Sequence, residues 1–101
     1  MSKLVVLYPQ PTDVKQFEKD YKVHIQLFHD KTGIPNDVTP YAITKFLNGQ
    51  EGVAPYYQMF SMPFDSFEAL QKTLASEEMQ EVAADAFRIS SGGDPVILMG
   101  E

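Results

Sequence analysis

Cysteine and tryptophan are both absent from this sequence of 101 residues. Without cysteine the chain cannot form a disulfide scaffold, a thiolate zinc site or a cysteine nucleophile. Long hydrophobic runs are also missing, since the longest, residues 4–7, is far below the ~20 residues that span a bilayer. Polar residues follow at 10–13, where a signal peptide would continue its apolar stretch. We therefore expect a cytoplasmic protein that does not enter a membrane.

Positive charge is scarce: 8 Lys and Arg stand against 14 Asp and Glu, which gives a net charge of −6. This balance argues against a nucleic-acid partner, because proteins bind the phosphates of nucleic acids through a patch of basic residues. Hydrophobic residues make up 44% of the chain and charged residues 22%, which is typical of a globular protein. No repeat or linker divides the sequence, so we expect residues 1–101 to form a single domain.

The first half of the chain has the pattern of a strand, a helix and a second strand. Residues 3–8 are rich in Leu and Val and predict a buried strand. Thr12 or Asp13 can cap a helix that ends before Gly33. The apolar stripe of this helix consists of Val14, Phe17, Tyr21, Ile25 and Phe28. Residues 38–47 then alternate with period two and predict a strand.

The second half predicts another strand, helical residues and a final strand. Residues 55–64 would pair with the preceding strand through a loop of about five to seven residues. Asp65 is a candidate N-cap with Glu68 closing a capping box, and Ser76 begins a continuing or second helix. Residues 95–99 complete the order βαββαβ. This order is that of a ferredoxin-like α+β fold with a four-stranded antiparallel sheet.

The predicted strands are apolar on both faces at positions 4–7 and 96–99, and in the third strand at 57 and 59 on one face and 56, 60, 62 and 64 on the other. Helices on one side can cover only one face of the sheet, and the other face would expose a large apolar patch. The simplest solution is a two-fold homodimer in which two sheets pack face to face.

Five segments spread over the chain are similar to segments of a known protein family. They are Lys3–Pro11, Phe17–Tyr21, Pro55–Tyr57, Phe64–Leu70 and Gly100–Glu101. Together they resemble the EthD-like family, which is named for ethyl tert-butyl ether degradation. The resemblance implies a dimeric α+β barrel of ferredoxin-like subunits. Relatives by architecture include small cofactor-free monooxygenases, muconolactone isomerases and haem-handling proteins.

A histidine late in the first helix is the site residue that the resemblance implies. The family pattern is Tyr, three residues, His, one residue, Pro-Leu, and residues 21–27 are its nearest match. Here two residues separate Tyr21 from His24, and Gln26 replaces the proline. His24 lies about 60° from the centre of the apolar stripe. An imidazole there could transfer a proton near pH 7, or it could be a helix-flank histidine bonded to water or a backbone carbonyl.

The remaining polar and aromatic residues suggest a ligand site and no metal site. His29 fits a solvated helix end, and its five-residue spacing from His24 is poor for metal chelation. Tyrosine hydroxyls could orient a ligand in an apolar pocket, with Tyr57, Met59 and Ser61 sharing one face of a strand. The candidate ligand-binding residues are Tyr8, Tyr21, Tyr57, Met59 and Ser61.

The sequence leaves three functions open. The first is a small dimeric barrel that binds an apolar or aromatic metabolite, with His24 as general base in a proton transfer (isomerase-type) or cofactor-free oxidation. The second is a non-catalytic accessory or carrier protein for an oxygenase system. The third is a haem-binding protein with His24 as the axial ligand, whereas the first two need no cofactor.

Overall fold

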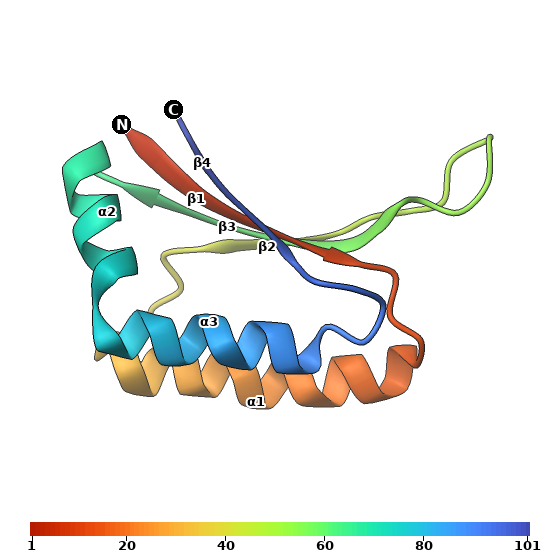
Figure 1. Cartoon of the computed structure of the whole chain (residues 1–101), viewed down its shortest axis with the longest axis horizontal. Coiled ribbons are helices and arrows are strands. Elements are labelled where there is room, and N and C mark those ends of the chain that lie inside the picture. The colour runs from red at the N-terminus through yellow and green to blue at the C-terminus, as the bar shows by residue number, and fades with distance from the viewer.

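A four-stranded antiparallel sheet with all of its helices on one face forms the structure, a computed structural model that describes residues 1–101 (Figure 1). The elements are β1 (Ser2–Pro9), α1 (Val14–Thr32), β2 (Ala42–Lys45), β3 (Tyr56–Phe64), α2 (Phe67–Ala75), α3 (Glu77–Ile89) and β4 (Val96–Gly100). The strand order is β2-β3-β1-β4. The predicted ferredoxin-like α+β architecture is confirmed, with the last helical region divided into α2 and α3.

Capping side chains define the helix ends. The Asp13 carboxylate accepts a hydrogen bond from Gln16 N at the start of α1, and Gly33, with φ of 77°, ends the helix. The cap of α2 is Ser66 and not Asp65 as predicted: its hydroxyl accepts from Ala69 N. Ser76 begins α3 as expected and separates it from α2. None of the helices has the length and apolarity that crossing a membrane requires.

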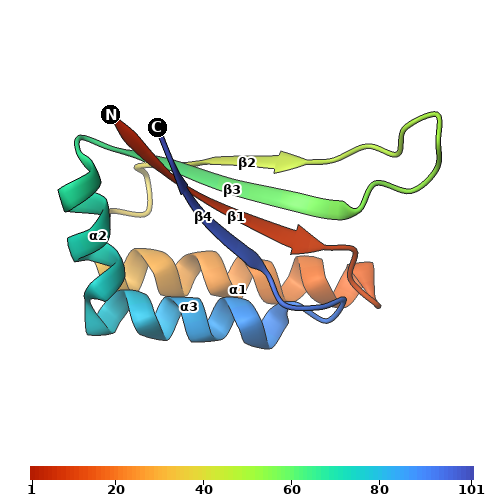
Figure 2. The ribbon, with the colours of Figure 1, turned by 45° about the horizontal axis from the view of Figure 1, so that its top comes forward.

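The connection between β2 and β3 is longer than predicted. β2 covers only residues 42–45, and residues 46–55 form a projecting hairpin arm, which Figure 2 shows extending beyond the sheet. A single bridge pairs Gly49 with Gly52 in the arm. The alternating pattern predicted a strand that reaches residue 47. In the structure the paired part of β2 ends earlier, with Lys45 opposite Gln58.

The two faces of the sheet have different surroundings. The helix face carries Leu4, Tyr8 and Phe60, which are buried under α1 and α3. The outer face has no helix against it in Figures 1 and 2. By alternation from the paired residues, its apolar positions are Val5, Leu7, Met59, Val96 and Leu98.

A bulge in β3 moves one predicted site residue to the other face. Tyr8 pairs with Gln58, but Pro9 pairs with Tyr56, so Tyr57 is an extra residue in β3. Such a bulge breaks strict alternation. The Tyr57 ring consequently contacts Phe17 of α1, with ring centroids 5.6 Å apart. The prediction that Tyr57 shares the face of Met59 and Ser61 is wrong for this reason.

Candidate active site

A cavity of about 90 Å³ lies between the helix face of the sheet and the helices α1 and α3. Twelve of its 14 lining residues are hydrophobic. His24 of α1 and Tyr8 of β1 contribute polar groups. Two lining residues are exposed, Gln80 of α3 and Ile97 of the edge strand β4. The cavity therefore opens between α3 and β4.

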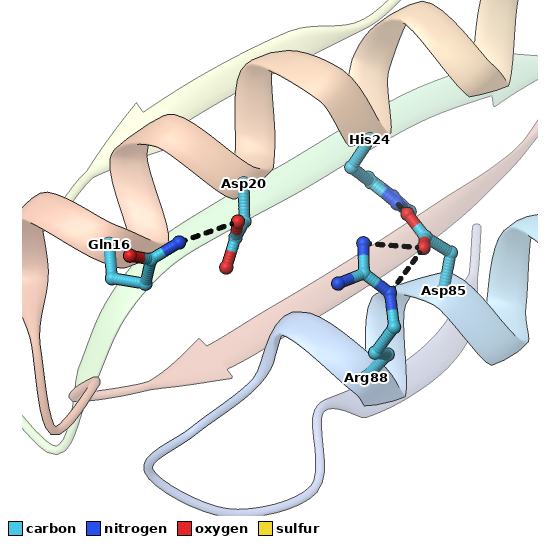
Figure 3. Close-up of polar contacts among 5 residues, drawn as sticks. All are labelled: Gln16, Asp20, His24, Asp85 and Arg88. Atoms are coloured by element: carbon cyan, nitrogen blue, oxygen red, sulfur yellow. Dashed lines mark hydrogen bonds and ion pairs between the residues drawn. The ribbon is translucent and has the colours of Figure 1, made fainter.

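His24 is paired with an acidic residue from the neighbouring helix. Its Nδ1 atom lies 2.8 Å from Oδ2 of Asp85 in α3, and Arg88 bonds the other carboxylate oxygen through Nε and Nη2, both at 2.8 Å (Figure 3). A carboxylate only accepts hydrogen bonds, so Nδ1 carries the proton in the neutral ring. Nε2 is then the acceptor, and it has no hydrogen-bond partner within the chain. With 5% of its surface exposed, His24 is buried more deeply than a helix-flank residue.

Burial and charge together favour a neutral imidazole beside an ionised carboxylate. Burial lowers the pKa of His24 from its ordinary 6.5, an effect that Asp85 opposes and Arg88 reinforces. Burial alone would raise the pKa of Asp85, but the hydrogen bonds and charges of His24 and Arg88 outweigh it and hold that pKa below 3.8. Near pH 7 the pair is therefore an imidazole with a free Nε2 and an aspartate that orients it.

Tyr8 lines the same cavity and has a hydroxyl without a hydrogen-bond partner. Only 2% of the residue is exposed, and the hydroxyl makes no hydrogen bond within the chain. Tyr21 lies between Tyr8 and His24, with a ring-centroid distance of 5.6 Å to each. Burial, followed by the charge of Asp85, raises the pKa of Tyr8 far above 10. Tyr8 therefore keeps its proton at every working pH.

Tyr21 lies next to the cavity but does not line it. Its hydroxyl and both amide atoms of Gln58 are sealed from solvent and lack hydrogen-bond partners of good geometry. Burial is the main cause that raises the pKa of Tyr21. This residue supports the Tyr8 and His24 rings by packing.

Tyr57, Met59 and Ser61 do not join this cavity. The Tyr57 hydroxyl donates to Oε1 of Glu18 in α1 at 2.5 Å, which, with burial, raises the pKa of Tyr57 to about 12. Lys45 of β2 bonds both oxygens of the same carboxylate at 2.7 Å. Met59 and Ser61 point to the outer face, so the five predicted ligand-binding residues fall into separate regions.

His29 is not the solvated helix end that the sequence predicts. It is 6% exposed, and both ring nitrogens are bonded. Nδ1–H donates to the Ile34 carbonyl at 3.0 Å, and the Tyr41 hydroxyl donates to Nε2 at 2.7 Å. His29 thus fixes the segment between α1 and β2, a role set by a loop that folds back over the ring.

Asp85 and Arg88 were missed by sequence reasoning. Asp85 is 61 residues from His24 in the chain, so no local motif joins them. The available signal was its place on α3, three residues after Val82 and four before Ile89, both buried. A carboxylate within a buried apolar stripe needs a partner. No group of three or more metal-ligating side chains comes together anywhere in the structure.

Comparison with known proteins supports the fold and gives the family. No curated protein matches the sequence. A crystal structure of an ethyl tert-butyl ether degradation (EthD) family protein from Bacillus halodurans is similar, with 27% identity, coverage of 100% of this chain and 97% of that one, and a TM-score of 0.80. A dimeric ferredoxin-like protein of unknown function from Jannaschia has 10% identity, coverage of 100% and 99%, and a TM-score of 0.70.

A third similar structure is described as an antibiotic biosynthesis monooxygenase, with 16% identity, coverage of 100% and 97%, and a TM-score of 0.57. At these identities the Jannaschia protein and the monooxygenase show the fold alone. The sequence itself matches the EthD domain over residues 9–91. This chain therefore belongs to the EthD family.

Proposed function

We propose that the chain is an enzyme that binds a small apolar or aromatic metabolite in the cavity and uses His24 as a general base. One observation carries the proposal: His24 lines the cavity, its Nδ1 is held 2.8 Å from Oδ2 of Asp85, and its Nε2 has no hydrogen-bond partner in the chain. An oriented, neutral imidazole in an apolar pocket is suited to taking a proton near pH 7. The apolar lining would exclude water from the reacting group.

Two outcomes of proton removal are compatible with these residues. The proton can return to the substrate at another atom, which is an isomerisation. Alternatively the resulting anion can react with molecular oxygen, which is a cofactor-free oxidation.

A second copy of the chain would complete the protein by covering the outer face of the sheet. Val5, Leu7 and Met59 are only half-buried there, and Leu98 is 47% exposed. An apolar face of this kind is typical of a homodimer interface. The similar Jannaschia protein is described as dimeric, which supports the same assembly.

Haem does not fit the cavity. Its volume of about 90 Å³ is much smaller than a porphyrin ring, and its lining has no cationic side chain for the propionates. A carrier would use the same pocket to bind the ligand without converting it. The experiment below distinguishes a carrier from an enzyme by measuring both binding and turnover.

Binding and turnover of a panel of phenols and enols would test the proposed function. Small phenols should raise the melting temperature of the wild type, and turnover should fall by about 10²–10⁴-fold in His24→Gln. Lys22→Gln, an exposed change on the same helix, is the matched control and should behave as wild type. Ala83→Phe, which fills the cavity, should remove binding. Binding without turnover in the wild type would decide for a carrier, and no binding would reject the pocket.

A further inference from the structure

Two buried residues that line the cavity each carry a polar atom without a hydrogen-bond partner in the chain. These atoms are Nε2 of His24 and the hydroxyl of Tyr8, in residues that are 5% and 2% exposed. Neither atom is among the sealed, unbonded atoms of the structure, which belong to Tyr21 and Gln58. Unbonded polar groups are costly inside an apolar core unless a ligand or water reaches them. The cavity therefore presents one acceptor and one hydroxyl donor to whatever occupies it.

The cavity is lined by residues from both core clusters, and the polar side chains of Tyr8 and His24 are associated with one of them. Tyr8 belongs to a core cluster with Phe17, Tyr21, Ala86 and Ile89, close to His24. The second cluster contributes only apolar lining residues, which include Phe28, Phe60, Met79 and Val82. A fitting ligand carries one small polar group beside an apolar part.

The size of the cavity limits the group that reaches His24. Its volume of about 90 Å³ is below the roughly 150 Å³ of a protein cavity that binds benzene. A ligand larger than this must leave part of itself in the opening beside Gln80 and Ile97. The reacting end of the ligand is therefore small.

The charges around the site select a neutral polar group. No Lys or Arg lines the cavity, and the nearby Asp85 carboxylate is engaged by His24 and Arg88. A carboxylate or phosphate on the ligand would lose its hydration with no cation to replace it. A carbonyl oxygen needs only a donor, and the Tyr8 hydroxyl is that donor.

We propose that the substrates are small, neutral aldehydes or ketones with a hydrogen on the carbon next to the carbonyl, and that Tyr8 donates to the carbonyl oxygen while His24 removes that hydrogen as a proton. This inference rests on the proposed function and narrows its substrate class. It also gives Tyr8, which sequence reasoning placed only in a general ligand pocket, a definite role.

The step balances without a cofactor. Nε2 of His24 takes the proton, the C–H bond breaks, and its electron pair forms a C=C bond to the carbonyl carbon. The carbonyl π pair moves to oxygen, which becomes an enolate oxygen held by the Tyr8 hydroxyl. The imidazolium beside Asp85 then returns the proton to carbon, or to another atom of the substrate in an isomerisation. Donors placed where such negative charge develops are a main source of catalysis.

Deuterium exchange into butanone in D₂O, followed by NMR, would test this inference. The wild type should speed exchange at C3 above the buffer rate, and Tyr8→Phe should lower the enzyme-dependent rate by about 10²–10³-fold. The pH midpoint of the residual activity should not change in Tyr8→Phe, because His24 remains the base. Tyr8→Phe should fold normally, since the hydroxyl it lacks has no partner in the chain. Tyr56→Phe, which is outside the cavity, is the matched control and should exchange at the wild-type rate.

The outcomes separate this inference from the proposed function. Phenol binding and turnover by the wild type without butanone exchange would overturn the ketone and aldehyde assignment alone. Equal exchange by the wild type and Tyr8→Phe would overturn the role of Tyr8. Failure to bind either probe would reject the pocket itself, and with it both proposals.

Discussion

At the scale of single residues, the acid–base behaviour of His24 results from groups on three elements. Burial disfavours the charged form of the His24 ring and lowers its pKa. Asp85 of α3 raises that pKa, and Arg88 of α3 lowers it. Tyr8 and Tyr21 add no charge, because their pKa values are raised. The direction of each contribution can be tested separately.

We predict that the pKa of His24 moves in opposite directions when its two charged neighbours are removed. Asp85→Asn should lower it further, since the carboxylate that supports the imidazolium is lost. Arg88→Gln should raise it, because a positive charge near the ring disappears. NMR titration of the His24 ring protons measures both shifts. Movement in the same direction in both variants would contradict the assignment of charges.

A pH dependence of stability follows from the same group. The pKa of His24 is lowered in the folded state, so below its unfolded value of 6.5 the unfolded chain binds the proton more readily. The contribution of His24 is therefore complete above pH 6.5 and is lost as pH falls through the folded pKa. Urea unfolding should show a free energy that declines more below pH 6.5 in the wild type than in His24→Gln. Identical slopes would argue that His24 is not buried.

His29 is expected to affect stability and not the cavity. His29→Ala removes both hydrogen bonds and leaves the Ile34 carbonyl and the Tyr41 hydroxyl without their partner. Loss of such buried partners costs about 1–3 kcal/mol. Denaturant unfolding should show this decrease, while binding of small phenols at saturating concentration is retained by the folded fraction. An unchanged free energy of unfolding would instead support the sequence prediction that His29 lies at a solvated helix end.

At the scale of the elements, the sequence was informative where signals are local. The Asp13 and Ser76 caps and Gly33 act within a few residues, and the structure confirms them. The apolar stripe of α1 is confirmed from Phe17 to Phe28, whereas Val14 is 45% exposed. The error at Ser66 has a local cause as well: either Asp65 or Ser66 can cap a helix, and only the backbone decides which one precedes the first turn. The bulge at Tyr57 depends on pairing with β1, so alternation within β3 could not reveal it.

The loop between α3 and β4 depends on one glycine. A Cβ at Gly92 would overlap the backbone carbonyl oxygen of Gln10, the residue that follows β1. Gly92→Ala should therefore destabilise the protein by about 1–3 kcal/mol or more, as overpacking does. Gly49→Ala, where nothing lies within 4 Å, is the control and should leave the melting temperature unchanged. Equal melting temperatures for the two variants would show that the loop can move away.

At the scale of the whole molecule, most of the architecture was predictable and most of the site was not. The order of strands and helices along the chain and the two apolar faces of the sheet follow from patterns along each segment. The His24–Asp85 pair joins α1 to α3, and the burial of His29 requires the segment after α1 to fold back. Both are tertiary contacts between residues whose sequence neighbours give no sign of the partner.

Assembly is also tested at this scale. We predict a homodimer at micromolar concentration, with at least ~1,200 Å² buried in total. Leu98→Glu, on the outer face, should shift sedimentation towards the monomer because the charge would be buried. Val23→Glu, on the exposed side of α1, is the matched control and should remain dimeric. A monomer at low micromolar wild-type concentration would contradict the assembly.

The position of β1 between β3 and β4 has a consequence for how the chain folds. β1 is made before both of the strands it pairs with, and these lie far along the sequence, with Leu4 paired to Met62 and to Met99. The edge of β1 that pairs with β3 therefore stays unpaired until residues 56–64 have been made, and the edge that pairs with β4 stays unpaired until residues 96–100 have followed. Folding that depends on such distant pairing is slow, and unpaired apolar edges invite aggregation. In a cell, this small domain would then need protection on the ribosome more than its size suggests.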